Sequence, residues 1–566
     1  MVVRVVALVV LAAAGAAFYS ARPAPARILP APSAGVPAVR GAIHVHSTRS
    51  DGSGDPASIA AAAARAGLNF VIFTDHGDAT RQPDEPRYID GVLCIDAVEL
   101  STDHGHVVAL GLPRVPYPLG GEARDVLDDI ARLGGFTIAA HIDSPKADLQ
   151  WSDRMTALGG IEWLNADSEW RDESFSSLAR GLFMYPAYGT AALTTLLDRP
   201  ISVLERWDAL TAERRIVAIA ASDAHARLGL RNLGEPEGSG SALHVPSYEN
   251  AFRMFSNVLP SATLSGVARQ DAEVVLAAIR DGRLYSVIDG LAGPGTLSFT
   301  ATSGTSTVSF GDVLPNADAA TVLRISIQGP EDAQLILIKD GEVLETSTGA
   351  ALERIVTGAP AVYRAEVSLP GAPGDPAVPW MVSNPIYVGR ASVEPIAAAQ
   401  SLPPSTFAFQ YRDGPTSAWT VEHSPESLGA IDEVKTETGQ QLSLRYALGG
   451  TTSSSAFTAF VMPAGADLPS HDRLMFTARA DHPMRMSVQI RERGGAAGER
   501  WHRSIYLEPT AREITVWFGD MLPRGETSRP RPVLANVESV LFVLDTVNTS
   551  LGGNGTLWLD DVKYAK

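Results

Sequence analysis

Histidines and carboxylates follow one another in short groups between residues 44 and 225. Seven of the twelve histidines of the chain lie in this span. The groups are His44-Val45-His46, Asp51, Asp75-His76, Glu99, His104-Gly105-His106, His141 and Asp223-Ala224-His225. Imidazole and carboxylate are ligands of divalent metals, and this mixture suits zinc, manganese or iron without choosing among them. The spacing therefore indicates a metal site.

Most of these groups come directly after a short apolar run. Such runs precede His44, Asp75, His141 and Asp223, and they are rich in branched residues. Continuous apolar runs are typical of strands buried on both faces of a parallel sheet. Residues spaced i, i+2 point to the same side of a strand, so both members of a pair such as His44 and His46 can reach one site. We expect the ligands to converge where these strands end.

The segments between the strands have helical signals. Asp55-Pro56 offers a cap and a proline at the first helical position, and an alanine-rich stretch over 58–66 ends at Gly67. Residues 122–133 repeat the scheme. Alternation of strand and helix predicts a parallel sheet covered by helices, here a TIM-like β/α barrel over residues 40–290.

Five ordered motifs resemble those of the PHP (polymerase and histidinol phosphatase) superfamily of metallohydrolases. They are H-V-H-S-T-R-S-D-G (44–52), F-T-D-H (73–76), E-L-S-T-D-H-G-H-V-V-A-L-G (99–111), A-H-I-D (140–143) and A-S-D-A-H (221–225). The G-H-V-V-A-L-G form and P-W-M-V-S-N-P-I-Y-V (379–388) are similar to the carbaryl-hydrolase-like branch of that superfamily. The resemblance covers about residues 40–290, with a weaker continuation to about 390.

The resemblance implies a distorted barrel that holds two or three divalent metal ions (Zn, Mn or Fe). One metal would take His44, His46, Glu99 and Asp223; a second would share Glu99 and add His106 and His141; a third would use Asp51, His76 and His225. Glu99 and His225 are expected to take part in catalysis together with Asp75, which we expect to orient its neighbouring ligand. His104 competes with His106, and we favour His106 because it opens an apolar strand.

The implied reaction is hydrolysis of a small-molecule ester by a metal-bridging hydroxide. A phosphoester is the first expectation, and a carbamate or carboxyl ester is the alternative. Arg49 and Arg81 are the expected substrate-binding residues, because a guanidinium can hold two phosphate oxygens; Lys146, Arg171 and Arg227 also lie near motifs. Trp residues near the site would favour an aryl substrate; the candidates are Trp151, Trp163, Trp170 and Trp207.

The N-terminus has the features of an export signal. Arg4 precedes an apolar stretch, and we expect residues 1–20 to be a signal peptide or an N-terminal anchor, followed by a Pro/Ala-rich linker over 21–39. Cys94 is the only cysteine, so the chain cannot form an internal disulfide. These features predict a periplasmic or extracellular protein that could remain anchored to the membrane.

Beyond the barrel, short alternating strands predict two all-β domains. A β-sandwich is expected over 293–390, with a hairpin at Asp340-Gly341. A jelly roll is expected over 404–566, because the ending L-W-L-D-D-V resembles galactose-binding-like domains. Trp501 or Trp517 could stack on sugar rings there, which leaves a non-catalytic carbohydrate-binding protein of the cell envelope as a further alternative. The net charge of −18 argues against an extended nucleic-acid-binding surface.

Overall fold

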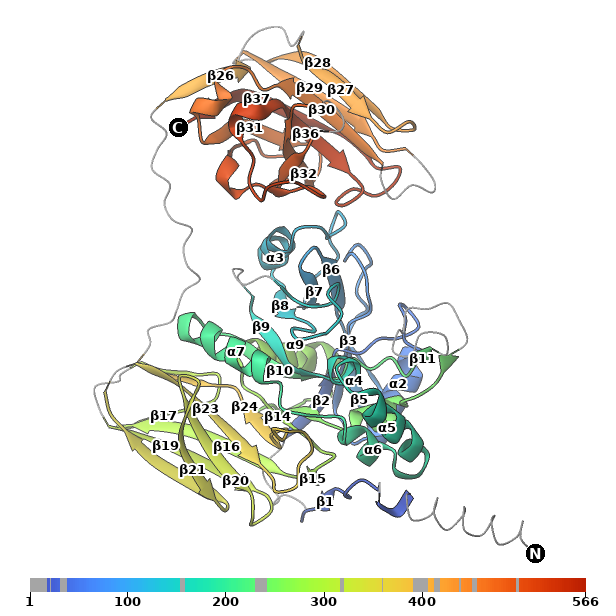
Figure 1. The fold of residues 1–566 in the computed structure, drawn as a ribbon, viewed down its shortest axis with the longest axis vertical. Helices are drawn as coiled ribbons and strands as arrows, with labels where there is room; N and C mark the ends of the chain where they lie inside the picture. The colour runs from blue at the N-terminus through green and yellow to red at the C-terminus, as the bar shows by residue number, and fades with distance from the viewer. Residues whose placement is uncertain are drawn as a thin grey trace, which may run out of the picture. The chain divides into compact units, whose positions relative to one another are not determined.

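The structure is a computed structural model of the chain, in which β-strands predominate over helices (Figure 1). It describes residues 18–20, 22–30, 38–152, 158–229, 242–315, 320–358, 360–389, 406–411, 418–436, 439–449, 456–494 and 498–566. Residues 1–17 of the expected export signal and 31–37 of the expected linker lie outside these ranges. In the part that is described, no helix is both long and apolar enough to cross a membrane.

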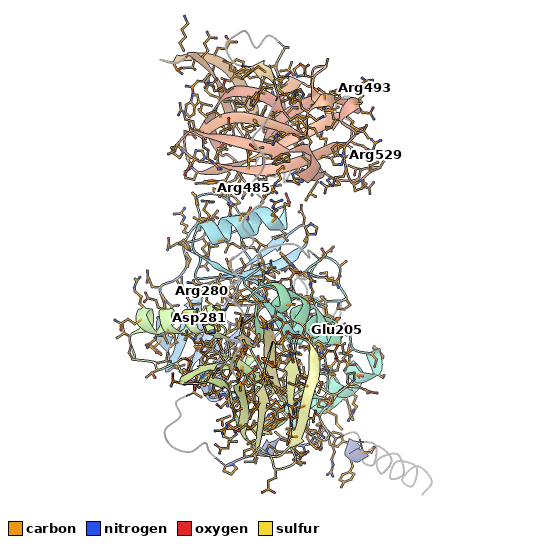
Figure 2. All side chains as sticks on the ribbon, turned by 90° about the vertical axis from the view of Figure 1, so that its left-hand side faces the viewer. Glu205, Arg280, Asp281, Arg485, Arg493 and Arg529 are labelled. Atoms are coloured by element: carbon orange, nitrogen blue, oxygen red, sulfur yellow. The ribbon has the colours of Figure 1, made fainter. Side chains whose placement is uncertain are left out.

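The chain divides into two compact units. The first comprises residues 1–77, 82–113 and 130–396, and the second comprises 78–81, 114–129 and 397–566. Figure 2 shows the side chains of both; Glu205, Arg280 and Asp281 belong to the first unit, and Arg485, Arg493 and Arg529 to the second. The protein is therefore multidomain.

Buried parallel strands form the N-terminal part of the first unit, as the apolar runs predict. β2 (Val39–Ile43), β3 (Phe70–Phe73) and β5 (Val92–Asp96) are parallel neighbours, and nearly all their side chains are buried. β4 (Arg87–Ile89) is antiparallel to β5 at the edge. On the other side, β13 (Ser256–Leu259) pairs antiparallel with β2 and β14 (Tyr285–Val287) pairs with β13.

A second sheet of the same unit carries the remaining ligand-bearing strands. Its order is β10 (Val217–Ala221), β9 (Gly160–Asn165), β8 (Phe136–Ala139), β7 (Gly105–Leu110) and β6 (Val98–Thr102). The pairs β10–β9 and β9–β8 are parallel, whereas β8–β7 and β7–β6 are antiparallel.

The two sheets meet where the histidine motifs begin. Parallel bridges join Val45 to Ala224 and His76 to Glu99, and the Ser222 N–H donates to the Ile43 carbonyl. The described ladders do not form a regular TIM barrel, in which every strand is parallel to its neighbours and is followed by a helix. Because β7 runs antiparallel to both β6 and β8, the described strands of this region form two mixed sheets, and the expected distorted barrel stays a prediction.

Helices cover these sheets. α2 (Pro56–Arg65) packs on β3 to β5, and its start follows the predicted signals, since the Asp55 side chain accepts from the Ser58 N–H at 2.8 Å. α9 (Ala268–Arg280) contacts β5 and β13, while α7 (Ile201–Glu213) contacts β9. Four further helices lie along the chain between β9 and β13: α4 (Ala166–Arg171), α5 (Phe175–Tyr188), α6 (Thr190–Thr194) and α8 (Tyr248–Phe252).

The β-rich segment after residue 293 continues the first sheet. β24 (Met381–Ser383) pairs with β14 and with β23 (Ala361–Ser368), and β23 pairs with β20 (Gln334–Lys339) and β25 (Ile386–Val388). β21 (Glu342–Thr348) follows β20 through the predicted Asp340-Gly341 turn. A separate four-stranded sheet has the order β17 (Ser306–Ser309), β16 (Thr296–Ser303), β19 (Thr321–Gln328) and β22 (Ala351–Val356).

The second unit is a β-sandwich. One sheet contains β28 (Leu428–Thr436), β29 (Gly439–Ala447), β37 (Asn554–Ala565), β31 (Arg473–Ala480), β34 (Arg512–Trp517) and β26 (Phe407–Tyr411). The other contains β27 (Thr420–His423), β30 (Phe457–Pro463), β36 (Val537–Asp545), β32 (Met484–Glu492), β33 (Arg500–Leu507) and β35 (Leu522–Pro523). Side chains of both sheets, such as Phe476 and Phe542, form one buried core. The unit also includes most of α3 (Ala123–Arg132).

Candidate metal centre

Four donor atoms from three strand ends converge on one point of the first unit. His44 Nε2 lies 3.0 Å from His46 Nε2, 3.2 Å from Glu99 Oε2 and 3.4 Å from Asp223 Oδ1. His46 Nε2 lies 3.2 Å from both carboxylate oxygens. Ligands about 2.0–2.2 Å from a tetrahedral zinc ion are about 3.3–3.6 Å from one another. The two histidine nitrogens are thus spaced from each other and from each carboxylate oxygen within a few tenths of an ångström of the edges of such a site.

The other oxygen of Glu99 faces a second group of donors. His106 Nδ1 lies 2.8 Å and His141 Nε2 lies 3.6 Å from Glu99 Oε1. His141 Nε2 is also 2.9 Å from Asp223 Oδ2. Glu99 therefore offers one oxygen to each of two adjacent sites, as the family resemblance implies for a bridging ligand.

A third group surrounds Asp51. His225 Nε2 lies 3.2 Å and His76 Nε2 lies 3.6 Å from Asp51 Oδ2, and His46 Nδ1 lies 3.3 Å from Asp51 Oδ1. The His46 and His225 rings stack with their centroids 4.2 Å apart. We call the nine residues of the three groups the metal cluster: His44, His46, Asp51, His76, Glu99, His106, His141, Asp223 and His225. The structure thus brings together every residue that the sequence indicated as a ligand.

Three members of the metal cluster have an uncommon backbone conformation. The φ angles of His44, His141 and Asp223 are 68°, 48° and 41°. Positive φ in a residue other than glycine costs about 1–3 kcal/mol and persists only where the surroundings impose it. All three residues lie one or two positions after the end of a buried strand, so the turn out of the strand directs each side chain toward the common centre.

The loop that carries Asp51 is held by residues outside the metal cluster. Asp75 accepts from the Ser47 N–H at 2.7 Å, from the Ser47 hydroxyl at 2.7 Å and from the Ser50 hydroxyl at 2.8 Å. A Cβ atom at Gly52 would lie 2.2 Å from the His46 carbonyl oxygen, so only glycine fits this close approach. Asp75 was expected to orient its neighbour His76; its partners here are instead Ser47 and Ser50.

Tyr248 links two of the ligand segments. Its hydroxyl lies 2.8 Å from the His46 carbonyl and 3.0 Å from the His225 carbonyl, and it accepts from the Ser53 N–H at 3.1 Å. Burial raises the pKa of this hydroxyl to about 12. It therefore stays protonated near neutral pH, and its single proton is shared between the carbonyls of the two segments.

The sequence interpretation missed Glu162 and Asn165, both on β9. Glu162 Oε1 lies 2.6 Å from His44 Nδ1, and Oε2 accepts from the His141 N–H at 3.0 Å. Asn165 Nδ2 donates to Glu162 at 2.8 Å and to Asp223 at 3.2 Å. A carboxylate on the outer nitrogen of a ligating histidine fixes its ring and raises its basicity. The signal was the acid inside the apolar run Ile161-Glu162-Trp163-Leu164.

Charge is strongly coupled within the metal cluster. Burial disfavours the charged form of Glu99 and Asp223, but nearby His44 and His141 outweigh it and hold both pKa values well below their usual range. Burial also opposes protonation of His141 and His225, yet the neighbouring carboxylates raise the pKa of each to about 9. Protons on the histidines therefore balance the buried carboxylates in the metal-free protein.

The donor set fits divalent metal ions. Among the described residues, Asp51 Oδ2 and Asp223 Oδ1 are buried without a hydrogen bond, although histidine nitrogens lie 3.2 Å from each. Buried carboxylate oxygens are costly when unsatisfied. A cation bound between these carboxylates and the histidine nitrogens around them would satisfy both oxygens.

The basic residues lie at different distances from this centre. Arg49 pairs with Asp84 and Asp96, in a separate depression that the metal cluster does not line. Arg81 belongs to the second compact unit. Arg171 lines the opening of the metal cluster, where it pairs with Asp167 on the same helix. His104 also lies apart, with Nδ1 3.1 Å from the Ser152 hydroxyl.

The tryptophans separate into core and cavity residues. Trp151, Trp163 and Trp207 are fully buried, whereas Trp170 is half-buried and lines an apolar cavity next to His225. In the second unit, Trp501 is fully buried, and the Arg473 guanidinium covers the half-buried Trp517 ring at 4.1 Å. Trp501 therefore cannot stack on a sugar ring in this conformation.

Comparison with known proteins gives no family for the chain. No protein-family description matches it, and no curated protein is similar to it. Among solved structures, a family 11 carbohydrate-binding module from Clostridium thermocellum, in complex with a mixed-linked tetrasaccharide, has 16% identity and a TM-score of 0.24; the match covers 28% of this chain and 94% of the module. A family 30 carbohydrate-binding module of a cellulosomal cellulase from Clostridium thermocellum has 9% identity and a TM-score of 0.22, covering 28% and 96%. An exo-beta-agarase has 14% identity and a TM-score of 0.21, covering 29% and 25%.

Proposed function

We propose that the chain is a metal-dependent hydrolase of the PHP type, with a distorted barrel as its catalytic part, that cleaves a small-molecule ester. The observation that carries this proposal is the convergence of Glu99 and Asp223 on His44 and His46: the two histidine nitrogens lie 3.0 Å apart, and each lies 3.2–3.4 Å from an oxygen of either carboxylate. Because histidine nitrogens lie beside both oxygens of Glu99, we expect the site to bind at least two adjacent ions. A phosphoester is the first substrate class, because Arg171 at the opening could hold a phosphoryl oxygen.

Divalent ions bound there would activate water at neutral pH and polarise the ester oxygen. The residues of the chain have separate tasks in this reaction. His44, His46, Glu99 and Asp223 hold the position of the first ion, and Glu162 keeps the His44 ring in place through Nδ1. His225 and Asp51 lie beside the opening, where a side chain can accept or return a proton. Asp75 acts at a distance, because it fixes the loop that carries Asp51.

The test compares two histidines separated by one residue. His106→Ala removes a donor 2.8 Å from Glu99, whereas His104→Ala changes a side chain that faces Ser152. We expect the wild type and His104→Ala to bind at least two zinc or manganese ions per chain and to hydrolyse one ester of a panel. The panel contains p-nitrophenyl phosphate, bis(p-nitrophenyl) phosphate, p-nitrophenyl acetate and an aryl carbamate. For His106→Ala we expect metal affinity or kcat/KM to fall by at least about 100-fold.

The outcomes separate the alternatives. Cleavage of only the acetate or the carbamate would favour the carbamate or carboxyl ester alternative at the same metal site. Stoichiometric metal with no ester cleaved by the wild type would contradict the enzyme proposal and favour the non-catalytic alternative. If His104→Ala lost as much metal as His106→Ala, the assignment of donors would be wrong. Export to the periplasm or the cell surface remains part of the proposal and rests on the N-terminal apolar stretch alone.

A further inference from the structure

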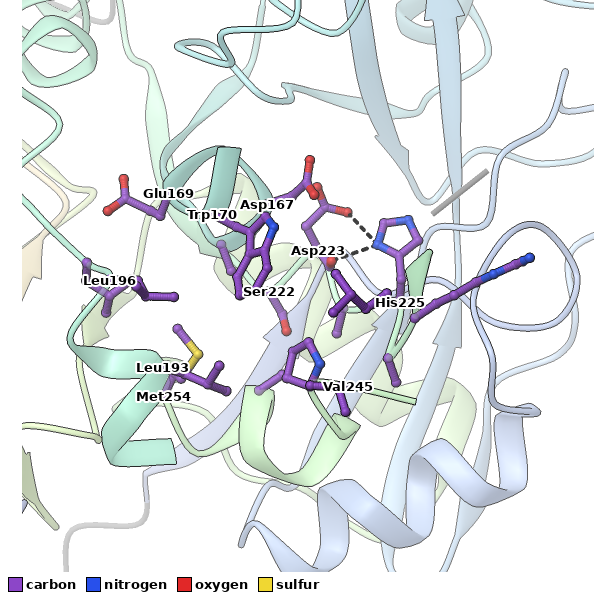
Figure 3. A pocket seen from close by; sticks show the side chains of 18 residues that line it. Asp167, Glu169, Trp170, Leu193, Leu196, Ser222, Asp223, His225, Val245 and Met254 are labelled. Carbon is purple, nitrogen blue, oxygen red and sulfur yellow. Dashed lines mark hydrogen bonds and ion pairs between the residues drawn. The ribbon is translucent and has the colours of Figure 1, made fainter. Parts of the chain in front are cut away.

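An apolar cavity of about 90 Å³ opens beside the metal cluster within the first unit. Its walls share Asp167, Asp223 and His225 with the opening of the metal cluster. Away from the metals the lining is mostly hydrocarbon, and its large side chains include Trp170, Leu193, Leu196, Leu197, Val245 and Met254 (Figure 3). A group held here would therefore be next to the reacting centre.

The short helix α4 serves both sites. Its cap Asn165 bonds to Asp223 and Glu162, which fixes the start of the helix against the metal cluster. Asp167 and Arg171 then line the metal opening, while Trp170 lines the cavity. Asp167 and Arg171 are four positions apart and share one face of α4, whereas Trp170, next to Arg171 in the sequence, projects from a different side of the helix into the cavity.

Apart from the three residues shared with the opening of the metal cluster, the polar or charged side chains of the lining are Glu169, Ser222 and Arg227. The carboxylate of Glu169 points away from its centre in Figure 3 and accepts from the Asp198 N–H at 2.8 Å. Burial raises the pKa of Glu169 well above its usual range, which disfavours the charged form. Ser222 is the one hydroxyl of the lining; its Oγ is buried and has no hydrogen-bond partner among the described residues. A mostly apolar recess with a few polar groups at its border is typical of a specificity pocket.

We infer that the ester cleaved at the metal cluster carries one compact apolar group, about the size of a phenyl ring or a branched alkyl chain, which binds in this cavity. The inference rests on the proposed hydrolase function and adds the substrate class to it. Trp170, Leu196 and Met254 are then specificity-determining residues, since they contact the apolar group and not the reacting atoms. Simple esters of methanol would leave the cavity unfilled.

The experiment compares benzyl with methyl esters, since these alcohols have similar acidity and differ in the apolar group. With the metal-loaded full chain, we expect kcat/KM for benzyl phosphate to exceed that for methyl phosphate by about 10–100-fold. If the enzyme prefers carboxyl esters, benzyl acetate and methyl acetate replace the phosphates. We expect Leu196→Trp, which fills the cavity, to bring the benzyl-to-methyl ratio close to one, and Trp170→Ala to lower it about tenfold. Because the ratio is taken within each variant, a loss common to both substrates cancels.

The matched control is Ile201→Trp, which adds the same ring on an exposed position of α7 and should leave the ratio unchanged. A wild-type ratio near one, or a ratio that Leu196→Trp does not change, would overturn the inference. If no ester is cleaved, the proposed hydrolase function is wrong, but the cavity assignment can still be tested. The test is then the binding of benzylphosphonate and methylphosphonate to the metal-loaded chain. Tighter binding of benzylphosphonate in the wild type but not in Leu196→Trp supports the cavity assignment; equal binding contradicts it.

Discussion

At the scale of single residues, the buried charges of the metal cluster determine how it responds to protons. Asp51, Glu99 and Asp223 have depressed pKa values, and each is close to a histidine whose pKa is raised. Metal ligands must be deprotonated, so an ion that enters the metal cluster has to displace those protons. Metal affinity and stability in the metal-free state therefore change with pH in opposite directions.

We predict that metal binding at pH 7.5 releases protons, because His141 and His225 have pKa values of about 9 in the metal-free protein. A raised pKa stabilises the fold fully below the usual histidine value of about 6.5, and this contribution is lost as the pH rises to about 9. The metal-free protein should thus become less stable between pH 6.5 and 9, while metal affinity increases. Calorimetric titration in two buffers with different ionisation enthalpies, together with urea unfolding in chelator, measures both. Identical heats in the two buffers at pH 7.5 would contradict the prediction.

Residue identity could be predicted where chemistry and strand position agree. His106 was preferred to His104 because it opens an apolar strand, and the structure places His106 and not His104 in the metal cluster. Arg49 shows the limit of such reasoning. It is three residues from His46 in the sequence, but the loop turns it toward Asp84 and Asp96. Glu162 was missed because a buried acid in a strand does not show which histidine it will contact.

At the scale of elements, the strand ends carry the site and α4 connects its parts. Buried strands were predictable from apolar runs, since a strand that is covered on both faces has apolar residues at every position and does not alternate with polar ones. The way these strands pair was not predictable, because an apolar run does not show that β7 runs antiparallel to both β6 and β8. α4 has only six residues, so its sequence has too few periods to mark it as a helix.

We predict that Asn165 has two separable functions. Its Oδ1 caps α4 by accepting from the Asp167 and Ser168 N–H groups, and its Nδ2 donates to Glu162 and Asp223. Asn165→Ala should lose both, with a loss of about 1 kcal/mol in the free energy of unfolding from the cap. Asn165→Asp should keep the cap but place an acceptor against two carboxylates, so metal affinity should fall by about tenfold or more.

Ser174→Ala is the matched control for the cap, since the Ser174 hydroxyl caps α5 by accepting from the Ser177 N–H at 3.1 Å. We expect it to lower stability as Asn165→Ala does and to leave metal affinity unchanged. Denaturant unfolding and competition with a chromophoric chelator measure the two quantities. Wild-type metal affinity in Asn165→Asp would refute the second function of Asn165.

At the scale of the whole molecule, the chain has one unit with the metal cluster and one unit that is a β-sandwich. The metal cluster lies entirely in the first unit, whereas the core of the second unit is built from the facing sheets of a sandwich. The all-β character of that unit was predictable, since a jelly roll was expected over 404–566 and the structure has two packed sheets there. A sheet shared between β14 and β24 was not predictable, because it pairs strands about 100 residues apart.

We predict that metal ions stabilise the first unit selectively. A ligand that binds only the native state adds about 4 kcal/mol when its concentration is 1,000 times Kd, and the gain is confined to the part that must unfold to release it. Hydrogen exchange of the full chain, followed by mass spectrometry, should show slower exchange in peptides from β2, β9 and β10 on addition of zinc or manganese. Peptides from β36 and β37 should not change. Asp223→Asn, which removes one of the two carboxylates beside His44, should abolish most of the effect. Equal slowing in both units, or protection that persists in Asp223→Asn, would show that the metal acts elsewhere in the molecule.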